Sequence, residues 1–329
     1  MSRAGLAVVL TVALGAAIVL GVRFGPVELT TGDVLAALAG RGVPWQHQIV
    51  VDLRLPRMLL GALVGGGLAL AGATFQALLR NPLAEPYILG ISGGASVGAV
   101  LVIALGLAGA ASWALPLAAL AGALLAVALV FRVATASGRS LDVRVLLLAG
   151  VVVAAFFSAC IAFILSISEA RTVQGAVLWI MGSLTGARWG SVAVAAAYTL
   201  PAAILLVGLA RPLNLIAIGE ETAHYLGADV EKVKRTALVL AALLTAAGVA
   251  VAGVIGFVGL VVPHTIRLLV GSDHRALLPL SFLGGATFLV LCDIVAQVVI
   301  APTQVPVGVI TAFVGVPLFL VLLRRSLVT

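Results

Sequence analysis

The stretch RLPRMLLGALVGGGLALAGATFQALLRNPLAEPYILGISGGAS, residues 54–96, decides the fold of this chain. Pro56 favours a helix start, because a proline at the first helical position loses no N–H group that the helix needs. The apolar run from Met58 to Leu79 that follows is about 22 residues long, which is enough to cross a bilayer. Gly61 and Gly65 stand four residues apart, a spacing that lets membrane helices approach closely. The stretch therefore predicts a membrane-spanning helix that packs against other helices.

A polar linker follows this helix. Its sequence, NPLAEP at residues 81–86, contains two prolines. Proline lacks the N–H group of a helical hydrogen bond and restricts the preceding residue to extended conformations. We therefore expect the helix to end near Arg80 and the linker to be extended. A turn between two helices is one interpretation. The other is the wall of a pathway, because non-helical backbone at membrane depth is tolerated only where it lines water or protein.

The composition is that of a membrane protein. The 329 residues are 63% hydrophobic and only 9% charged, whereas a soluble domain is nearer half apolar and a quarter charged. The net charge of +7 does not indicate nucleic-acid binding, because the basic residues are scattered between apolar runs. Cys160 and Cys292 both lie in apolar runs, where we expect small hydrophobic side chains rather than a disulfide. Residues 4–22 lack a convincing cleavage site, so we expect a retained first helix rather than a signal peptide.

Ten apolar segments predict ten membrane spans within one transmembrane domain, residues 1–329. The expected spans are 4–22, 57–79, 91–109, 113–132, 144–166, 190–210, 236–253, 255–270, 276–298 and 306–323. The longest polar segments, 23–56 and 211–235, then fall on opposite sides of the membrane.

The loop charges predict the orientation. Thirteen basic residues share a side with the N-terminus: Arg3, Arg80, Arg132, Arg139, Arg144, Arg211, Lys232, Lys234, Arg235, Arg267, Arg275, Arg324 and Arg325. Six lie on the other side: Arg23, Arg41, Arg54, Arg57, Arg171 and Arg188. Because cytoplasmic loops carry the excess of Lys and Arg, both termini and segment 211–235 are expected in the cytoplasm.

Two absences restrict the mechanism. The chain has no G-x-x-x-x-G-K-[ST] phosphate loop, since neither Lys232 nor Lys234 follows a glycine. The spans also lack the buried carboxylates or histidines of a proton-coupled transporter, since Asp293 and Glu169 fall near the outer ends of their helices. A transporter of this kind needs a partner that supplies energy. We expect no catalytic residue, no cofactor and no metal site in this chain.

The polar segment 211–235 predicts a short helix between two spans. Glu220 and Glu221 suit the positive N-terminal end of a helix, and Gly227 suits its C-terminal stop. Asp229 can then cap the span that follows.

This short helix has two interpretations. Ala223 and Leu226, three residues apart, would give it a small apolar face. From physics alone, a helix that lies at the membrane interface is the simpler interpretation. The alternative is a compact two-helix knob on the cytoplasmic side that docks into a cleft of a partner protein.

Four separated motifs resemble the FecCD family, the permease subunits of bacterial ABC importers for ferric siderophores, haem and vitamin B12. The resemblance covers roughly residues 20–325. The motifs are the RLPR, Gln76, NPLAEP and LGISGGA elements of residues 54–95, GEETAHYLG at 219–227, GFVGLVVPHTIR at 256–267 and VPVGVITAFVGVP at 305–317.

The resemblance implies an all-α polytopic membrane protein of about ten helices with the type II ABC importer permease architecture. It implies a homodimer in the bacterial inner membrane, in contact with lipid. Two ATP-binding cassette subunits, which bind ATP and Mg, would dock inside, and a periplasmic or lipid-anchored substrate-binding protein would dock outside. The chain itself would then not be an enzyme.

The resemblance also implies site residues. Contact with the ATPase is expected at Gly219, Glu220, Glu221, Ala223, Leu226 and Gly227, and the cytoplasmic gate at Asn81 and Leu83. Arg54 and Arg57 would dock an acidic patch of the binding protein, where arginine can grip carboxylates with two hydrogen bonds. Snorkelling of these two side chains to lipid phosphates is the alternative. Gln297 and Gln304 stand where the family commonly has Arg and Glu, so docking here would use fewer charges.

Two other motif segments allow several interpretations. His264 could ligate a metal, but no second ligand follows at suitable spacing in its segment, which favours a structural or capping histidine. Gly308, Thr311 and Gly315 of the last motif could face the pathway or simply pack.

The sequence thus predicts the permease subunit of a binding-protein-dependent ABC importer, which moves an iron chelate, haem or cobalamin by ATP-driven alternating access. The substrate is not determined, because no ligand set chooses among these cargoes. A gradient-driven secondary transporter or channel is the competing class, and a structural membrane scaffold is a third.

Overall fold

The computed structural model describes residues 2–109, 113–135 and 143–328, and within them all regular structure is helical. The elements are α1 (Arg3–Arg23), α2 (Thr31–Leu38), α3 (Pro44–His47), the π-helix η1 (Gln48–Arg54), α4 (Leu55–Leu78), the 3₁₀ helix η2 (Pro86–Leu89), α5 (Ile91–Ala104), the 3₁₀ helix η3 (Leu107–Gly109), α6 (Ala114–Thr135), α7 (Val143–Ser166), α8 (Ala170–Ile180), α9 (Trp189–Gly208), α10 (Ala210–Ile218), α11 (Glu220–Tyr225), α12 (Val230–Ala252), α13 (Val258–Val270), α14 (His274–Val298) and α15 (Val307–Val328).

Ten of these helices correspond to the ten expected spans. Seven are long and apolar enough to cross a membrane: α1, the continuous helix Pro44–Leu78, α6, α7, α9, α12 and α14. Three shorter apolar helices, α5, α13 and α15, make up the rest. Arg139, counted above among the cytoplasmic basic residues, lies outside the described residues.

Helix α4 begins at Leu55 with Pro56 in its first turn, as expected, but a helical segment rather than a loop precedes it. Helical structure begins at Pro44 and runs through η1 into α4, so part of the expected 23–56 loop is helix. Pro56 is tolerated inside because the backbone widens into a π-turn just before it, where the N–H of Leu55 bonds to the carbonyl of Val50.

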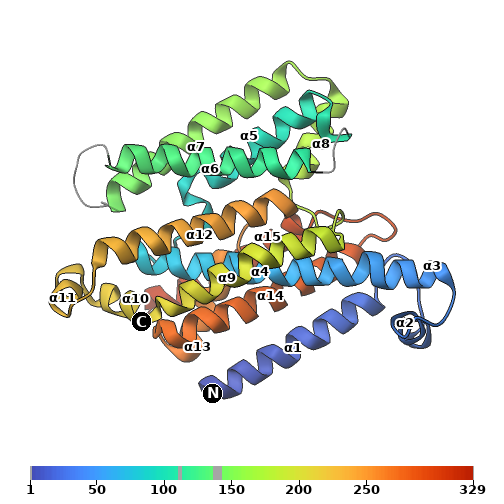
Figure 1. Ribbon diagram of the computed structural model, residues 1–329, viewed down its shortest axis with the longest axis horizontal. Coiled ribbons are helices and arrows are strands. Elements are labelled where there is room, and N and C mark those ends of the chain that lie inside the picture. Colours follow the sequence, from blue (N-terminus) through green and yellow to red (C-terminus); the bar gives the residue numbers. More distant parts are fainter. Residues whose placement is uncertain (1, 110–112, 136–142, 329) are drawn as a thin grey trace.

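Helix α4 forms the centre of the molecule (Figure 1). In an apolar 18-residue stretch of the continuous helix Pro44–Leu78, 83% of the residues are buried inside the protein. In the corresponding stretches of α1 and α6 the buried share is 22%. It packs against α1, α9, α12, α13 and α14. Close approach depends on glycine, because a Cβ atom at Gly72 would overlap the carbonyl group of Gly259 in α13.

The helices form two groups (Figure 1). Helices α5 to α8 pack on one another at the top of the view, and α12 connects them to the group around α4. The end of the molecule that carries α10 and α11 is called here the Glu220 end, and the opposite end, with α2 and α3, is called the Arg57 end.

Candidate functional site

The NPLAEP linker begins with an exposed turn. Helix α4 ends at Leu78, and Arg80 then takes a left-handed conformation, with φ of 48°. The Asn81 side chain closes the turn, because its Oδ1 accepts a hydrogen bond from the Leu83 N–H at 2.9 Å. Both Asn81 and Leu83 are exposed, and Leu83 keeps 43% of its surface. The two expected gate residues therefore lie together at the tip of the linker.

The base of the linker is held by Gln76. This buried side chain directs its Nε2 at the carbonyl oxygens of Ala84, Gly259 and Leu260, at 3.3–3.4 Å. Its Oε1 accepts a hydrogen bond from Arg267 Nη2 at 2.8 Å. One amide thus joins α4, the linker and α13, which satisfies backbone groups that would otherwise be unpaired inside the protein.

A second helix break lies against the linker. The chain is non-helical between α12 and α13, at residues 253–257. The Tyr87 hydroxyl donates to the carbonyl of Ile255 at 3.0 Å and accepts from the N–H of Ile255 at 3.1 Å. Glu85 Oε1 accepts from the N–H of Phe257 at 3.1 Å. Burial raises the pKa of the Glu85 carboxyl, and the hydrogen bond from Phe257 opposes this shift. The linker is therefore anchored at its base and free at its tip.

The segment 211–235 folds as its caps predict. Helix α11 begins at Glu220, and Gly227 follows it in a left-handed conformation, φ 84°, which glycine adopts without strain. Asp229 caps α12, because its Oδ1 accepts from the Lys232 N–H at 3.1 Å. The segment also contains α10, which the sequence did not predict separately.

The expected shared apolar face of α11 is wrong. Ala223 is fully buried, whereas Leu226 is 62% exposed and Tyr225 88% exposed. Ile218, at the end of α10, is 73% exposed. Ala223 lies in the helix proper and faces the protein, but Leu226 is the C-cap residue, where the chain turns outward. The exposed apolar side chains are thus available to a partner.

Asp273, the N-cap residue of α14, connects the start of that helix to α10 and to the start of α1. Asn214 Nδ2 donates to Asp273 Oδ1 at 2.8 Å, and Arg3 Nη1 donates to Asp273 Oδ2 at 2.8 Å. The hydrogen bonds from Asn214 and from the Arg275 N–H, followed by that from Arg3, lower the pKa of Asp273. These contacts place the N-terminus at the Glu220 end.

At the Arg57 end, Arg54 is buried and bonds only to backbone in the described contacts. Its Nη1 donates to the carbonyls of Val22 and Arg23, at 2.9 and 3.0 Å, and its Nη2 to that of Val27. Val22 and Arg23 are the last two residues of α1, and Val27 follows that helix, so Arg54 fixes the chain where it leaves α1. Its positive charge is not compensated by any described carboxylate.

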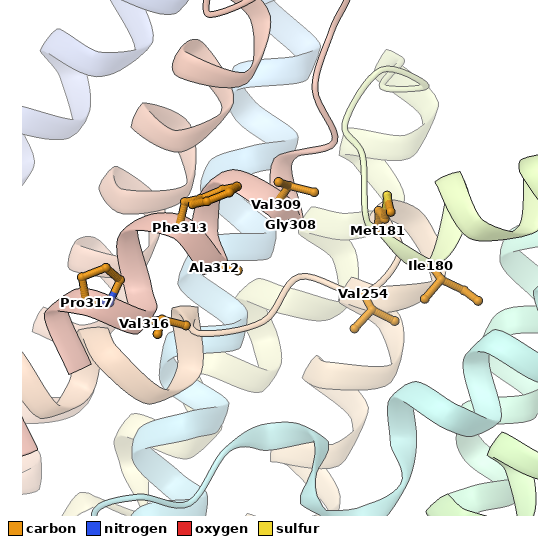
Figure 2. A pocket seen from close by; sticks show the side chains of 9 residues that line it. All are labelled: Ile180, Met181, Val254, Gly308, Val309, Ala312, Phe313, Val316 and Pro317. Atoms are coloured by element: carbon orange, nitrogen blue, oxygen red, sulfur yellow. The ribbon is translucent and has the colours of Figure 1, made fainter. Parts of the chain in front are cut away.

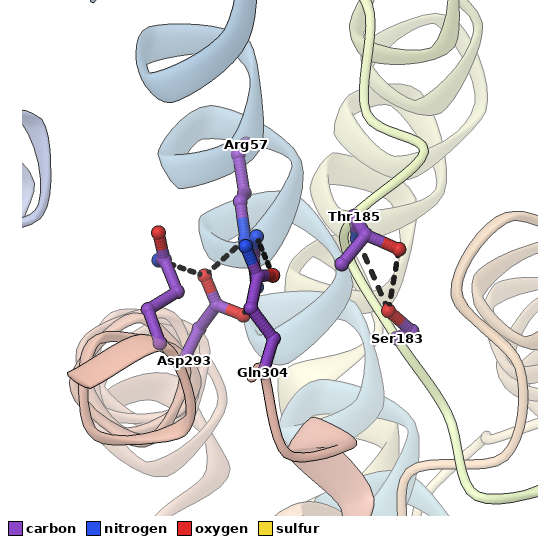
Figure 3. Close-up of polar contacts among 6 residues, drawn as sticks. Arg57, Ser183, Thr185, Asp293 and Gln304 are labelled. Carbon is purple, nitrogen blue, oxygen red and sulfur yellow. Dashed lines mark hydrogen bonds and ion pairs between the residues drawn. The ribbon is translucent and has the colours of Figure 1, made fainter. Parts of the chain in front are cut away.

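Arg57 forms a buried ion pair with Asp293 (Figure 3). Its Nε and Nη2 donate to the two carboxylate oxygens at 2.7 and 2.8 Å, and its Nη1 donates to Gln304 Oε1 at 2.7 Å. Gln297 Nε2 also donates to Asp293, at 2.9 Å. The expectation that the spans hold no buried carboxylate is therefore wrong, since Asp293 has no exposed surface. Arg57 compensates its charge, as a buried carboxylate requires.

Arg54, Arg57, Gln297 and Gln304 line one pocket of about 260 Å³. Its other walls are Pro26, Val27, Ile49, Leu53, Thr185 and Ala187. Thr185 is held by Ser183, whose Oγ accepts from the Thr185 N–H at 3.2 Å (Figure 3). All four polar residues that the sequence analysis singled out at this end thus line the same pocket.

A larger, apolar cavity of about 570 Å³ lies between α8, α15 and the second helix break (Figure 2). Its walls are Ile180, Met181, Val254, Gly308, Val309, Ala312, Phe313, Val316 and Pro317. No charged side chain is among them. Phe313 is 74% exposed, so one side of the cavity is open.

The last motif divides between this cavity and packing. Gly308 lines the cavity, whereas Thr311 is fully buried and donates its hydroxyl to the Gly308 carbonyl at 3.0 Å. Gly315 packs on Phe257, whose side chain a Cβ atom would overlap.

His264 is 9% exposed in α13, and its Nδ1 has no hydrogen-bond partner among the described residues. Within those residues, no three His, Cys, Asp or Glu side chains gather as a metal site would require.

Sequence comparison finds relatives over most of the chain. A profile described as the FecCD transport family matches residues 12–325. The chain is 46% identical to the cobalamin import system permease protein BtuC of Halobacterium salinarum, over 86% of this chain and 75% of the relative. It is 43% identical to the hemin transport system permease protein HmuU of Yersinia pestis, over 84% of each chain. It is 40% identical to an uncharacterized ABC transporter permease protein of Bacillus subtilis, YvrB, over 95% of this chain and 91% of the relative.

A solved structure has the same fold. It is a metal-chelate type ABC transporter in an inward-facing conformation, with a TM-score of 0.86 and 33% sequence identity. The match covers 96% of this chain and 97% of that one.

Proposed function

This chain belongs to the FecCD transport family, the permeases of ABC importers, and we propose that it moves cobalamin, haem or a ferric chelate across the cytoplasmic membrane by ATP-driven alternating access. The match to a metal-chelate type ABC transporter over 96% of the chain carries the proposal most directly. The relatives named for cobalamin and hemin import support the substrate class.

We place the energy source on a separate subunit that binds ATP and Mg. This subunit would dock on the segment Gly219 to Gly227 of the permease, which includes Glu220, Glu221, Ala223 and Leu226. Three exposed apolar side chains, Ile218, Tyr225 and Leu226, support this surface, because burial of such side chains favours association. The buried ion pair of Asp293 speaks against a proton-coupled alternative, because Arg57 already compensates that carboxylate.

The substrate-binding protein would dock at the Arg57 end. Of the two expected contacts, Arg54 is better suited to attract an acidic patch, because its charge is uncompensated and the pocket of 260 Å³ opens beside it. Arg57 would act mainly by holding the pocket wall through Asp293. This arrangement agrees with docking through few charges.

The gate would be the exposed linker tip, with Asn81 and Leu83, and two copies of the chain would enclose one pathway. The open apolar cavity beside α15 supports this arrangement, because a second copy would close its exposed side. Small and apolar walls suit a pathway that does not bind its cargo tightly. We place both termini and α11 in the cytoplasm, with lipid around the outer helices.

The test is reconstitution of the chain in lipid vesicles with its co-expressed ATPase subunit and binding protein. Uptake of cobalamin, haem and a ferric siderophore is compared with and without internal ATP. We expect the ATPase subunit to co-purify and one of the three cargoes to enter only with ATP. Equal uptake by the chain alone, without nucleotide, would show a secondary transporter or channel instead.

A further inference from the structure

Three charged side chains meet at the Glu220 end. Both carboxylate oxygens of Glu220 lie 3.1 Å from the Nζ atom of Lys234, and Oε1 lies 3.8 Å from Nη2 of Arg80. The three residues come from three segments. Glu220 begins α11, Lys234 lies in α12, and Arg80 joins α4 to the linker that carries Asn81. One carboxylate therefore connects the short helix to a long helix and to the linker.

The two contacts of Glu220 differ in strength. The Lys234 side chain is 6% exposed, so its ammonium group depends on a hydrogen-bonding acceptor such as Glu220. The Arg80 side chain is 45% exposed and that of Glu220 41% exposed, and their 3.8 Å contact is a longer, solvated ion pair of the kind that contributes little to stability. The contact to Lys234 can thus hold Glu220 in place, while the contact to Arg80 can break and re-form.

The position of Arg80 makes the weaker contact important for the linker. Arg80 has φ of 48°, a conformation that is uncommon for a residue other than glycine and that sets the direction in which the chain leaves α4. The exposed turn closed by Asn81 and Leu83 follows directly. Displacement of the Arg80 side chain therefore moves the chain where the linker tip begins. The base of the linker stays in place, because Gln76 bonds to the Ala84 carbonyl.

We propose that Glu220 is a positioning residue that transmits movement of α11 to the linker tip through Arg80. This inference rests on the proposed function, in which α11 docks the ATPase subunit and the tip forms the gate. Lys234 keeps the carboxylate oriented, and Arg80 follows α11 in one state of the cycle and is released in the other.

The test uses the complete complex of permease, ATPase subunit and binding protein in lipid vesicles, with Glu220→Gln in the permease. The amide keeps the size of the side chain but removes its charge. We expect at least a fivefold lower number of cargo molecules imported per ATP hydrolysed, a ratio that does not depend on how much ATPase subunit the complex retains. The matched control is Glu231→Gln, because Glu231 is 40% exposed and pairs with Arg235 at the same distance of 3.8 Å within α12. Its import per ATP should stay at the wild-type value.

A second pair of variants separates transmission from docking, since Glu220 also lies on the docking surface. Arg80→Gln should reproduce the loss of import per ATP while the ATPase subunit still co-purifies, and Arg80→Lys, which keeps the charge, should restore at least half of the wild-type ratio. An unchanged ratio in both Glu220→Gln and Arg80→Gln would overturn the inference and leave the proposed function intact. A wild-type complex without ATP-driven import would instead contradict the proposed function, and the inference with it.

Discussion

The guanidinium group of Arg57 and the carboxylate of Asp293 form a two-pronged ion pair that joins α4 to α14, with N–O distances of 2.7 and 2.8 Å. The residues are 236 positions apart in the sequence, and the Asp293 side chain is fully buried. Two parallel hydrogen bonds fix the relative rotation of the two helices as well as their distance. The pair therefore fixes the position of α4 relative to α14 at the Arg57 end and holds Gln304, beside the pocket where we expect the binding protein.

Removal of one partner of this pair should be costly. Asp293→Ala leaves the buried Arg57 charge without its carboxylate, for which we expect a loss of about 3–5 kcal/mol in the free energy of unfolding. Thermal unfolding of the purified permease in detergent would show this as a lower midpoint. The double variant Arg57→Met, Asp293→Leu removes both charges, so its free energy of unfolding should fall clearly less than that of Asp293→Ala. A single variant as stable as wild type would contradict the prediction.

The pair also shows what the sequence could not predict. The NPLAEP break, the start of α11 at Glu220 and the Asp229 cap were predicted, because proline, glycine and capping side chains act on neighbouring backbone. The burial of Arg57 was not, because it depends on a partner in a distant helix. The signal that could have found it is a single carboxylate, Asp293, in one apolar run, since such a residue implies an opposite charge in another.

The helical segment that precedes Pro56 was not predicted, for a local reason. A proline inside a helix normally breaks it, but a π-turn before Pro56 rearranges the hydrogen bonds and lets the helix continue from Pro44. The role of Tyr87 was also missed. Its partner is the backbone of Ile255, and sequence patterns do not show which distant backbone groups a helix break leaves unpaired.

Close contact between α4 and α13 should depend on Gly72. A Cβ atom there would overlap the carbonyl group of Gly259, so we expect Gly72→Ala to cost about 1–3 kcal/mol through overpacking. The control is Gly15→Ala in the exposed part of α1, where a Cβ atom meets nothing within 4 Å. Its free energy of unfolding should be unchanged or higher by up to about 1 kcal/mol, because alanine is the better helix former. Thermal unfolding of both variants checks the difference, and equal midpoints would contradict it.

Glu85, which lies outside the spanning helices, should make stability depend on pH. Burial raises the pKa of its carboxyl above the ordinary value of 4.5, so the folded state holds a proton more tightly than the unfolded state. The resulting stabilisation is fully present below pH 4.5 and is lost as pH rises through the raised pKa. Glu85→Gln keeps an oxygen for the Phe257 N–H and removes the charge, so it should unfold at a higher temperature than wild type at pH 8. The two midpoints should converge below pH 4.5, and a constant difference at all pH values would contradict the assignment.

The apolar cavity beside α15 gives a direct test of the pathway. Ala312 lines this cavity, so Ala312→Cys should react with a water-soluble thiol reagent in the reconstituted complex, and its modification should lower ATP-driven uptake at least fivefold. The background is Cys160→Ser, because Cys160 is partly exposed, whereas Cys292 is buried. Ala296→Cys in α14 is the matched control, since Ala296 has no exposed surface and its thiol should stay unmodified. If Ala312→Cys is labelled fully but uptake continues at the unmodified rate, the cargo does not pass beside α15, and the cavity is only a space that lipid or a second copy covers.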